Sequence, residues 1–274
     1  MLIYINHLVY LYQNNIEIFC KDVPISILLY LNIFQILAEQ NMIPSIAERQ
    51  NSCMLCNSKA TIFKCLCSPE LEMLNESRVE VNFKAGEMMF KQGTPSPHFL
   101  CLTKGLAKIY IEGFNGRNLI LGIVKPVEYI LGPGIYVDNR HHYSGVAIED
   151  SSACLIDTLS FKSIIRTNPD FAEEFIRRVS LQAIFNFDQV ISLTQKQMPG
   201  RIADVLIYLR GIVYEANPFS LSLSRQDLAD MSGMSKESAI RILKDFKDEG
   251  IIRIDGSRFE IINEAQLHKI SQTG

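Results

Sequence analysis

The longest helical pattern in the sequence spans residues 169–197 and separates two parts of different character. Asn168 is a residue type that caps helices and Pro169 suits a first helical position, and no further glycine or proline follows before Pro199. Short alternating apolar runs precede this pattern, and shorter helical patterns follow it. The sequence therefore predicts a β-rich part and a helical part that are joined by one long helix.

Short apolar runs fill residues 79–159 and read VEVNF, FLCLTKGLAKIYI, NLILGIVKP, YSGVAI and ACLIDTL. Glycine and proline separate these runs at short intervals, and the gaps show no helical period. Several short strands at such spacing indicate an antiparallel sandwich or barrel, whereas a parallel sheet would need crossover helices. We therefore do not expect a parallel sheet in this part of the chain.

Apolar residues recur along residues 169–197 at alternating steps of three and four, which is the spacing of a coiled-coil seam. A helix of this length has more apolar surface than one neighbouring domain can cover. We therefore expect the seam to pair with the same helix of a second chain and to form a homodimer. The seam residues are Ile176, Val179, Ala183, Asn186, Val190 and Leu193.

Residues 223–250 hold two short helical patterns that are separated by only a few small residues. Ser224 and Asp227 form a reciprocal capping pair for the first helix, and Gly233 permits a sharp turn. Ser235 stands where it caps the second helix. In that helix four residues at helical spacing face inward, namely Ala239, Ile242, Leu243 and Phe246.

The opposite face of this second helix carries Glu237, Arg241 and Lys244, with Lys236 at its tip. Arginine can offer two donors to guanine, and glutamate can accept a hydrogen bond from cytosine. Residues 251–262 then read as two strands joined by Asp255-Gly256, a hairpin signal. The pattern predicts a helix-turn-helix with a β wing that binds a double-stranded DNA operator. Candidate contacts are Ser224, Arg225, Gln226, Ser235, Lys236, Glu237, Ser238, Arg241 and Lys244.

Two stretches resemble the family of the cyclic-AMP receptor protein and the fumarate-nitrate regulator (CRP/FNR). LSRQDLADMSGMSKESAIRILKDFKDEGIIRIDG is similar to the DNA-binding domain of that family, and FKAGEMMFKQGTPSPHFLCLTKGLAKIYIEGFNGRNLILGIVKP is similar to its β-roll. The resemblance covers roughly residues 60 to 270. It implies a cytoplasmic, homodimeric bacterial transcription regulator with RNA polymerase as a partner. The base-reading positions of the family fall on Lys236, Glu237 and Arg241.

The expected fold class is α+β, with an N-terminal antiparallel β-roll of the cyclic-nucleotide-binding type (a jelly roll), a long dimerisation helix and a C-terminal winged helix-turn-helix. We expect an N-terminal extension over residues 1–50, which could reflect a start codon placed too early, with residues 1–41 dispensable. The remaining predicted segments are a Cys-containing helical lead-in (51–77), the sensory β-roll (78–167), the dimerisation helix (168–197) and the DNA-binding domain (198–274).

The sensor departs from the relatives that bind cyclic nucleotides. Those relatives carry a Gly-Glu-Leu turn and, about ten residues later, an arginine that holds the phosphate. Here Pro133 stands at the glutamate position, and His142-Tyr143-Ser144 stands where the arginine would lie. A buried phosphate without a cation lacks its countercharge. Arg140 could supply one only after a loop shift, so we do not expect cyclic AMP to bind.

The chain has seven cysteines, and the resemblance gives several of them a possible role. The fumarate-nitrate branch holds a [4Fe–4S] cluster with three N-terminal cysteines and one from the β-roll, and Cys154 occupies the place of the fourth. The other candidate ligands are Cys53, Cys56, Cys65 and Cys67, although their spacing departs from that branch. These four could instead hold zinc by themselves or bind no metal, and Cys154 could be a core residue.

Other function classes have weaker support in the sequence. The net charge of −3 gives no global positive field, so any DNA contact must come from a local surface. We expect no enzyme, because phosphate-binding loops and nucleophile motifs are missing. A redox or metal-dependent thiol protein is the alternative that the cysteines leave open. A membrane-tethered sensor through residues 1–40 is another, but the apolar run 25–37 is shorter than the about 20 residues that a span needs.

Overall fold

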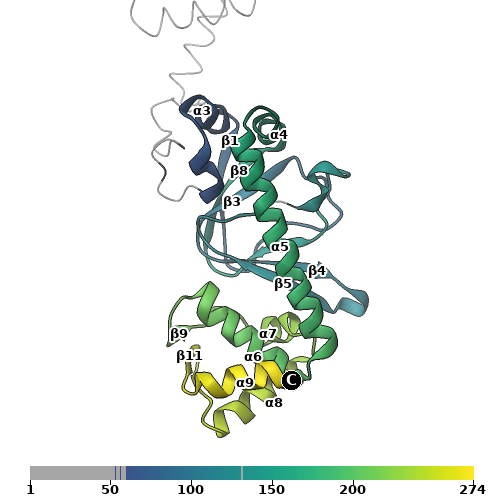
Figure 1. Cartoon of the computed structure of the whole chain (residues 1–274), viewed down its shortest axis with the longest axis vertical. Helices are drawn as coiled ribbons and strands as arrows, with labels where there is room; N and C mark the ends of the chain where they lie inside the picture. The colour runs from purple at the N-terminus through teal and green to yellow at the C-terminus, as the bar shows by residue number, and fades with distance from the viewer. Residues whose placement is uncertain (1–52, 54–55, 57–59, 131) are drawn as a thin grey trace, which may run out of the picture. The chain divides into compact units, whose positions relative to one another are not determined.

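Residues 53, 56, 60–130 and 132–274 are described by a computed structural model of the chain (Figure 1). The expectations for residues 1–50 lie outside the described residues. None of the helices in the described part of the chain is long and apolar enough to cross a membrane.

Two antiparallel four-stranded sheets form the β-rich part, with strand orders β1-β8-β3-β6 and β2-β7-β4-β5. The predicted antiparallel sandwich is confirmed, and strands distant in the sequence pair within each sheet. The strands are β1 (Arg78–Phe83), β2 (Met88–Phe90), β3 (His98–Lys104), β4 (Ala107–Glu112), β5 (Asn118–Val124), β6 (Tyr129–Ile130), β7 (Ser144–Ala147) and β8 (Ser151–Asp157).

The central strand β3 is buried on both faces, which explains its continuous apolar run. Leu100 and Leu102 belong to the core between the two sheets. Phe99 and Cys101, at alternate positions along the strand, face a second core under helices. The helices that cover this core are η2 (Thr61–Cys65), α3 (Ser68–Glu76), α4 (Thr158–Thr167) and the start of α5 (Pro169–Gln195).

Helix α4 was not predicted from the sequence, which assigned residues 78–167 to the β-roll as a whole. Asp157 caps it, because its carboxylate Oδ2 accepts a hydrogen bond from the backbone nitrogen of Ser160 at 2.9 Å. Phe161 and Ile164 are buried on its inner side. The signal was present as an aspartate followed by apolar residues at helical spacing, but the preceding run was interpreted as one strand through to Leu159. Two single-turn 3-10 helices also lie in this part, η3 (Phe114–Gly116) and η4 (Pro133–Tyr136).

The predicted long helix is confirmed as α5. Its capping residue is Asn168, whose side chain Oδ1 accepts a hydrogen bond from the backbone nitrogen of Phe171 at 3.0 Å. The helix ends at Gln195, before the breaker pair, and Pro199 lies within the first turn of the next helix, α6 (Met198–Tyr208). A proline tolerates that position because the first turn has unpaired N–H groups. A π-helical turn, η5 (Leu209–Val213), follows.

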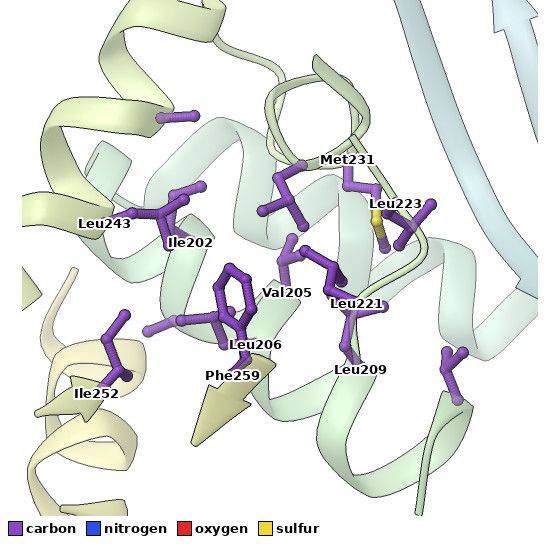
Figure 2. Packing of buried hydrophobic residues seen from close by; sticks show 14 of the residues in the cluster. Ile202, Val205, Leu206, Leu209, Leu221, Leu223, Met231, Leu243, Ile252 and Phe259 are labelled. Carbon is purple, nitrogen blue, oxygen red and sulfur yellow. The ribbon is translucent and has the colours of Figure 1, made fainter. Parts of the chain in front are cut away.

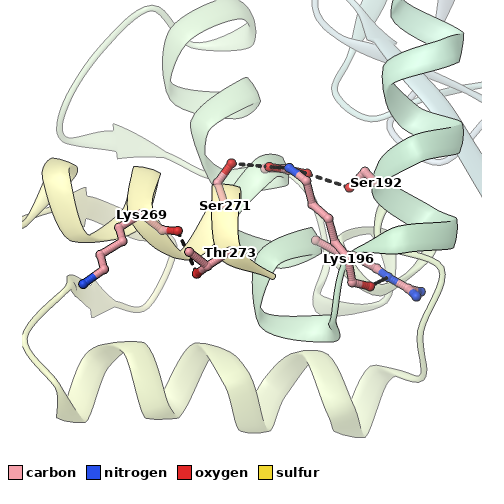
Figure 3. A network of polar contacts seen from close by, with 7 residues as sticks. Ser192, Lys196, Lys269, Ser271 and Thr273 are labelled. Carbon is pink, nitrogen blue, oxygen red and sulfur yellow. Dashed lines mark hydrogen bonds and ion pairs between the residues drawn. The ribbon is translucent and has the colours of Figure 1, made fainter.

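Asp204 on α6 fixes the corner between α5 and the C-terminal domain. Figure 3 labels the three residues that donate to it, Ser192, Lys196 and Ser271. Its carboxylate accepts hydrogen bonds from Ser192 Oγ at 2.6 Å and from Lys196 Nζ at 2.8 Å, both at the end of α5. It also accepts one from Ser271 Oγ at 2.5 Å, which comes from the last helix, α9 (Glu264–Thr273). One carboxylate therefore ties three helices together.

The C-terminal domain packs its helices and a small sheet around one apolar core (Figure 2). The sheet has three strands in the order β10-β11-β9, so the two-strand wing expected from the sequence gains a short partner. Strand β9 and helix α9 were not predicted. The elements not yet given are β9 (Phe219–Ser220), α7 (Arg225–Met231), α8 (Lys236–Asp248), β10 (Ile252–Asp255) and β11 (Arg258–Ile261).

Candidate nucleic-acid interface

Helices α7 and α8 have the caps that the sequence predicted. Ser224 Oγ accepts a hydrogen bond from the backbone nitrogen of Asp227 at 3.1 Å, and Asp227 Oδ2 accepts one from the backbone nitrogen of Ser224 at 2.8 Å. Ser235 Oγ accepts from the backbone nitrogen of Ser238 at 3.2 Å. Between the helices Gly233 has a φ of +60°, a left-handed conformation that favours glycine, and a Cβ there would lie 2.9 Å from the end of the Leu193 side chain.

The recognition surface, which we define as the exposed side of α8, is mostly charged and carries both basic and acidic side chains. The four predicted inward residues of α8 are buried in the domain core. Lys236, Glu237, Arg241 and Lys244 are all exposed, so the structure brings these sequence-predicted residues together on one side of one helix. Such a surface can present guanidinium, ammonium and carboxylate groups to base edges and phosphates.

Glu237 has the protonation state that an acceptor needs. A hydrogen bond from its own backbone N–H and another from the side chain of Ser235 hold the pKa of Glu237 below its usual value. The N-terminus of a helix also favours a negative charge. The carboxylate is therefore ionised at neutral pH and can accept a hydrogen bond from a base amino group.

Arg225 and Gln226 on α7 are partly occupied by contacts inside the domain. The guanidinium of Arg225 lies 4.7 Å from the centroid of the Phe259 ring, and its NH2 donates to the carbonyl oxygen of Gly256 at 3.4 Å. Gln226 Nε2 donates to Asp230 Oδ1 at 2.7 Å. Arg225 thus connects the first helix of the motif to the tip of the wing, a role that the sequence did not reveal.

A second residue that sequence reasoning missed is Lys108 on β4. Its Nζ forms an ion pair with Asp227 Oδ1, and the side chain of Asp227 is 10 % exposed. Burial alone would raise the pKa of Asp227, but hydrogen bonds from Lys108 and Ser224 hold it below its usual value. The capping carboxylate of α7 therefore also contacts the β-roll. No local sequence signal could have paired two residues so far apart in the chain.

The wing has a cross-strand ion pair. Arg253 and Glu260 are direct partners in the register of β10 and β11, and Arg253 NH1 lies 2.7 Å from Glu260 Oε2. The predicted turn lies between these strands, where Gly256 has a φ of +57°. Once the hairpin is placed, its register follows from the turn, so this pair could have been found from the sequence.

The predicted seam on α5 lies among exposed apolar side chains. Ile176, Val179 and Val190 are exposed, whereas Ala183 is half-buried. Asn186 is exposed and its Oδ1 accepts a hydrogen bond from Gln182 Nε2 at 3.0 Å. Leu193 is half-buried and lies against the Gly233 turn of its own chain. The exposed large apolar side chains of α5 are Ile176, Val179, Leu181, Ile184, Phe187, Val190 and Ile191.

The segment that corresponds to the cyclic-nucleotide pocket of relatives contains groups that are already engaged. Arg140 NH1 donates to the carbonyl oxygen of Gly93 at 2.6 Å, and His142 Nε2 lies 3.1 Å from Asp138 Oδ1. His141 is buried and its ring stacks on Phe90 with the centroids 4.3 Å apart. Burial lowers the pKa of His141, which favours a neutral ring.

The candidate metal ligands fall into two places. Cys154 on β8 and Cys101 on β3 are opposite each other in the strand register, and both are buried free cysteines. Cys154 Sγ accepts a hydrogen bond from Arg78 NH1 at 3.3 Å. Burial raises the pKa of Cys101 well above its usual value, and the nearby thiols of Cys154, Cys53 and Cys56 raise it further.

Cys65 and Cys67 belong to the other place. Cys65 Sγ donates to the carbonyl oxygen of Ile62 at 2.9 Å, and Cys67 precedes α3, with its backbone nitrogen donating to Glu70 Oε2 at 2.9 Å. Within the described residues, no three His, Cys, Asp or Glu side chains converge in a way that could hold a metal ion. The five cysteines proposed from the sequence therefore do not fit one metal centre in this structure.

Comparison with known proteins adds independent evidence for both parts of the chain. Residues 200–270 match the Crp-like helix-turn-helix domain, and residues 80–168 match the cyclic nucleotide-binding domain. The two matches fall on the winged helix-turn-helix and on the β-roll with α4. Their order along the chain is the one predicted from the sequence.

Curated relatives are transcription regulators. The chain is 26 % identical over 188 residues to the transcriptional activator protein Anr of Pseudomonas protegens, which covers 67 % of this chain and 77 % of the relative. It is 24 % identical over 214 residues to a CRP-like cAMP-activated global transcriptional regulator of Mycobacterium tuberculosis, covering 77 % of this chain and 96 % of the relative.

Solved structures share the fold. FixK2 of Bradyrhizobium japonicum superposes with a TM-score of 0.66 at 20 % identity, covering 72 % of this chain and 98 % of the other. The relatives found are regulators rather than enzymes. From the two domain matches, the regulator relatives and the shared fold, the chain belongs to the CRP/FNR family of DNA-binding transcription regulators.

Proposed function

We propose that the chain acts in the cytoplasm as a homodimer that reads a two-fold operator through α8 and responds to a signal received by its β-roll. The observation that carries this proposal is the recognition surface, where Lys236, Glu237, Arg241 and Lys244 are exposed on one side of α8. In helix-turn-helix regulators the second helix enters the major groove with its N-terminal residues at the base edges. RNA polymerase is the further partner that regulation of transcription requires.

The test of this proposal is selection of binding sites from a pool of random double-stranded DNA with the full chain. We expect enriched sites to contain two inverted half-sites about one DNA turn apart. The paired substitution Lys236→Ala and Arg241→Ala should abolish the enrichment, while Lys64→Ala combined with Lys269→Ala, which also removes two exposed positive charges, should leave it. Recovery of random sequences by the unchanged protein would overturn the proposal.

The homodimer is proposed from the apolar side chains of α5. Seven large apolar residues of this helix are exposed to solvent, which is more than a solitary surface helix usually presents. Ile176, Val179 and Val190 among them belong to the predicted seam with coiled-coil spacing, and a second copy of the same helix offers the same spacing in return. Phe187, Ile184 and Ile191 join the predicted seam, whereas Leu193 is partly covered by its own chain.

Dimerisation is tested by placing charges on that surface. Val179→Lys combined with Val190→Lys should convert the protein into monomers with weak DNA binding, because neither lysine can be paired in the seam. A matched control is Glu173→Lys with Asp188→Lys, two exposed positions of α5 outside the predicted seam. Sedimentation at micromolar concentration gives the readout, and a monomeric unchanged protein would contradict the homodimer.

We infer that the signal is not cyclic AMP. The segment that would hold the cyclic phosphate carries Pro133 at the glutamate position and His142-Tyr143-Ser144 where cAMP-binding relatives have the arginine, and Arg140 donates to the Gly93 carbonyl. A phosphate buried there would lack its countercharge. Isothermal titration with cyclic AMP should give no heat of binding, and micromolar affinity would overturn this inference.

A metal centre at the N-terminal cysteines is a second candidate for the sensor. The observation that favours it is that the thiols of Cys53 and Cys56 raise the pKa of Cys101 and the thiol of Cys56 raises the pKa of Cys154, although within the described residues these side chains do not converge as a metal site. Four thiolates are what a [4Fe–4S] cluster or a structural zinc ion requires. Cys65 and Cys67, on η2 and at the start of α3, are the less suitable members of the predicted set.

Anaerobic purification followed by iron, sulfide and zinc analysis tests this candidate. If a cluster forms, Cys154→Ser should abolish iron and sulfide incorporation, and Cys67→Ser, the exposed cysteine, should leave both. A zinc site on the N-terminal cysteines alone would survive Cys154→Ser. Colourless protein without iron or zinc would assign Cys154 to the core.

A further inference from the structure

One residue on the recognition surface differs in kind from its neighbours. Ile240 is 45 % exposed on α8, although the residues next to it on that side are charged. Ile240 is four residues from both Lys236 and Lys244 and three residues after Glu237, so these side chains lie on the same side of the helix. An apolar side chain therefore stands in the middle of a polar surface.

Neither packing nor helix formation requires isoleucine at this position. The inward side of α8 is already filled by Ala239, Ile242, Leu243 and Phe246, all of them buried. A β-branched residue is a weaker helix former than leucine, lysine or glutamate, which would suit an exposed helix position better. Its presence is unexplained by the fold of the domain alone.

The major groove offers one apolar group, the C5-methyl of thymine, beside the donors and acceptors of the other bases. Ile240 lies in the second turn of α8, within the part of a recognition helix that reaches base edges. Its branched side chain stands between Glu237 and Lys244, so a base pair next to the one that Arg241 or Glu237 contacts would face it.

We propose that Ile240 selects a thymine in each half-site by packing against its C5-methyl group. This inference rests on the proposed function, since it requires α8 to enter the major groove. It adds a specificity-determining residue and the base that it prefers. The half-site then combines polar contacts from Glu237 and Arg241 with one apolar contact, and methyl-free bases at that position are discriminated against.

The test removes either side of the contact. In the selected operator, each thymine is replaced in turn by uracil, which lacks only the C5-methyl group, and the Kd of the full chain is measured by fluorescence anisotropy. At one thymine per half-site we expect binding to weaken about fourfold, the equivalent of about 0.8 kcal/mol for one buried methyl group. Ile240→Ala should bind the thymine operator more weakly and should show no further loss with uracil.

The matched control is Ile262→Ala, the same change at a residue that is 48 % exposed between the wing and α9. This variant should keep the full uracil penalty, and thermal unfolding of both variants should match the unchanged protein. The inference is overturned if no thymine is sensitive to uracil, or if Ile240→Ala keeps the same penalty. In either case selective binding would persist, whereas failure of the proposed function would show as the absence of any selected operator.

Discussion

Helices α7 and α8 begin in the same way, with a serine cap and a carboxylate in the first turn, yet the two carboxylates meet different surroundings. Asp227 is buried, completes the capping box of α7 and pairs with Lys108 of the β-roll. Glu237 is exposed at the start of α8. The carboxylate in the first turn therefore stabilises the fold in α7, whereas in α8 it is free to contact a ligand. The difference comes from what each helix packs against, since α7 contacts β5 of the β-roll and α8 packs on α6, α7 and β10.

Removal of the buried carboxylate of Asp227 should have the largest effect, a loss of folding stability. Asp227→Ala leaves the Lys108 ammonium partly buried without its partner and removes half of a capping box, so we expect the free energy of unfolding to fall by about 3 kcal/mol. Urea denaturation of the full chain measures it. Asp245→Ala, at an exposed position of α8, should change stability by less than about 0.5 kcal/mol. Equal losses in the two variants would mean that the ion pair contributes nothing.

Arg241→Ala tests the other side of the comparison, where the effect should fall on binding and not on stability. A bidentate guanine contact contributes about 1–3 kcal/mol of discrimination, so operator affinity should drop roughly tenfold to hundredfold. Non-specific affinity should stay nearly constant. Lys269→Ala on α9 removes a positive charge from the same domain and serves as control. Footprints on a matched and a scrambled operator give the comparison, and equal losses on both would reduce Arg241 to a phosphate contact.

Loss of the serine cap should lower the free energy of unfolding by a different amount in α7 and in α8, and this effect is smaller than the two above. Ser224→Ala and Ser235→Ala each remove a side-chain acceptor from a helix start, which costs about 1 kcal/mol. The loss should be larger at Ser224, because its hydroxyl donates to the buried carboxylate of Asp227 at 2.7 Å, whereas the carboxylate beside Ser235, that of Glu237, is exposed. Replacement of Ser235 by glycine should cost only a few tenths of a kcal/mol. Chemical denaturation ranks the variants, and a larger loss at Ser235 would reverse the assignment.

The smallest expected effect is a difference in acid stability between the unchanged protein and Asp227→Asn. The pKa of Asp227 is raised by burial but lowered more strongly by the hydrogen bonds from Lys108 and Ser224, so its net shift is downward. A carboxylate with a lowered pKa in the folded state contributes its full stabilisation above the unfolded-state pKa of about 3.9. This contribution to the free energy of unfolding is lost as the pH falls through the folded-state pKa. Between pH 7 and pH 3 the unchanged protein should therefore lose more stability than Asp227→Asn.

Glu174 does not disturb this measurement. Hydrogen bonds from Arg177 and Arg178 lower the pKa of Glu174 to about 2, and it titrates alike in both proteins. The difference between the two pH curves then isolates Asp227. Parallel curves would show that its carboxylate is not coupled to Lys108 in solution.

Several elements could be recognised from the sequence because their signals are local. The caps at Ser224 and Ser235, the coiled-coil spacing of α5 and the Asp255-Gly256 hairpin each depend on residues within a few positions of one another. Helix α4 had such a signal at Asp157 as well, but the apolar run before it was extended too far. Strand β9 has only two residues, and it becomes a strand through its pairing with β11.

The candidate site was predictable to a similar extent. The exposed side of α8 follows from helical periodicity, since burying Ala239, Ile242, Leu243 and Phe246 leaves Arg241 and Lys244 outward. For the cysteines, the spacing grouped Cys65 and Cys67 with Cys53 and Cys56. In the structure the thiols of Cys53 and Cys56 raise the pKa of Cys101 instead. Cys101 was not a candidate from the sequence, because it lies beside Cys154 only through the pairing of β3 with β8.

Local chemistry along the chain was sufficient to specify where helices and turns begin, which side of each helix is apolar, and which residues of α8 are free to contact DNA. These properties depend on hydrogen bonds and periodicities that span three to seven residues. Tertiary structure decided which carboxylate is buried, which thiols are neighbours and that Arg225 supports the wing. Such contacts join residues far apart in sequence, and the cost of burying a charge is set by the partner that packing supplies.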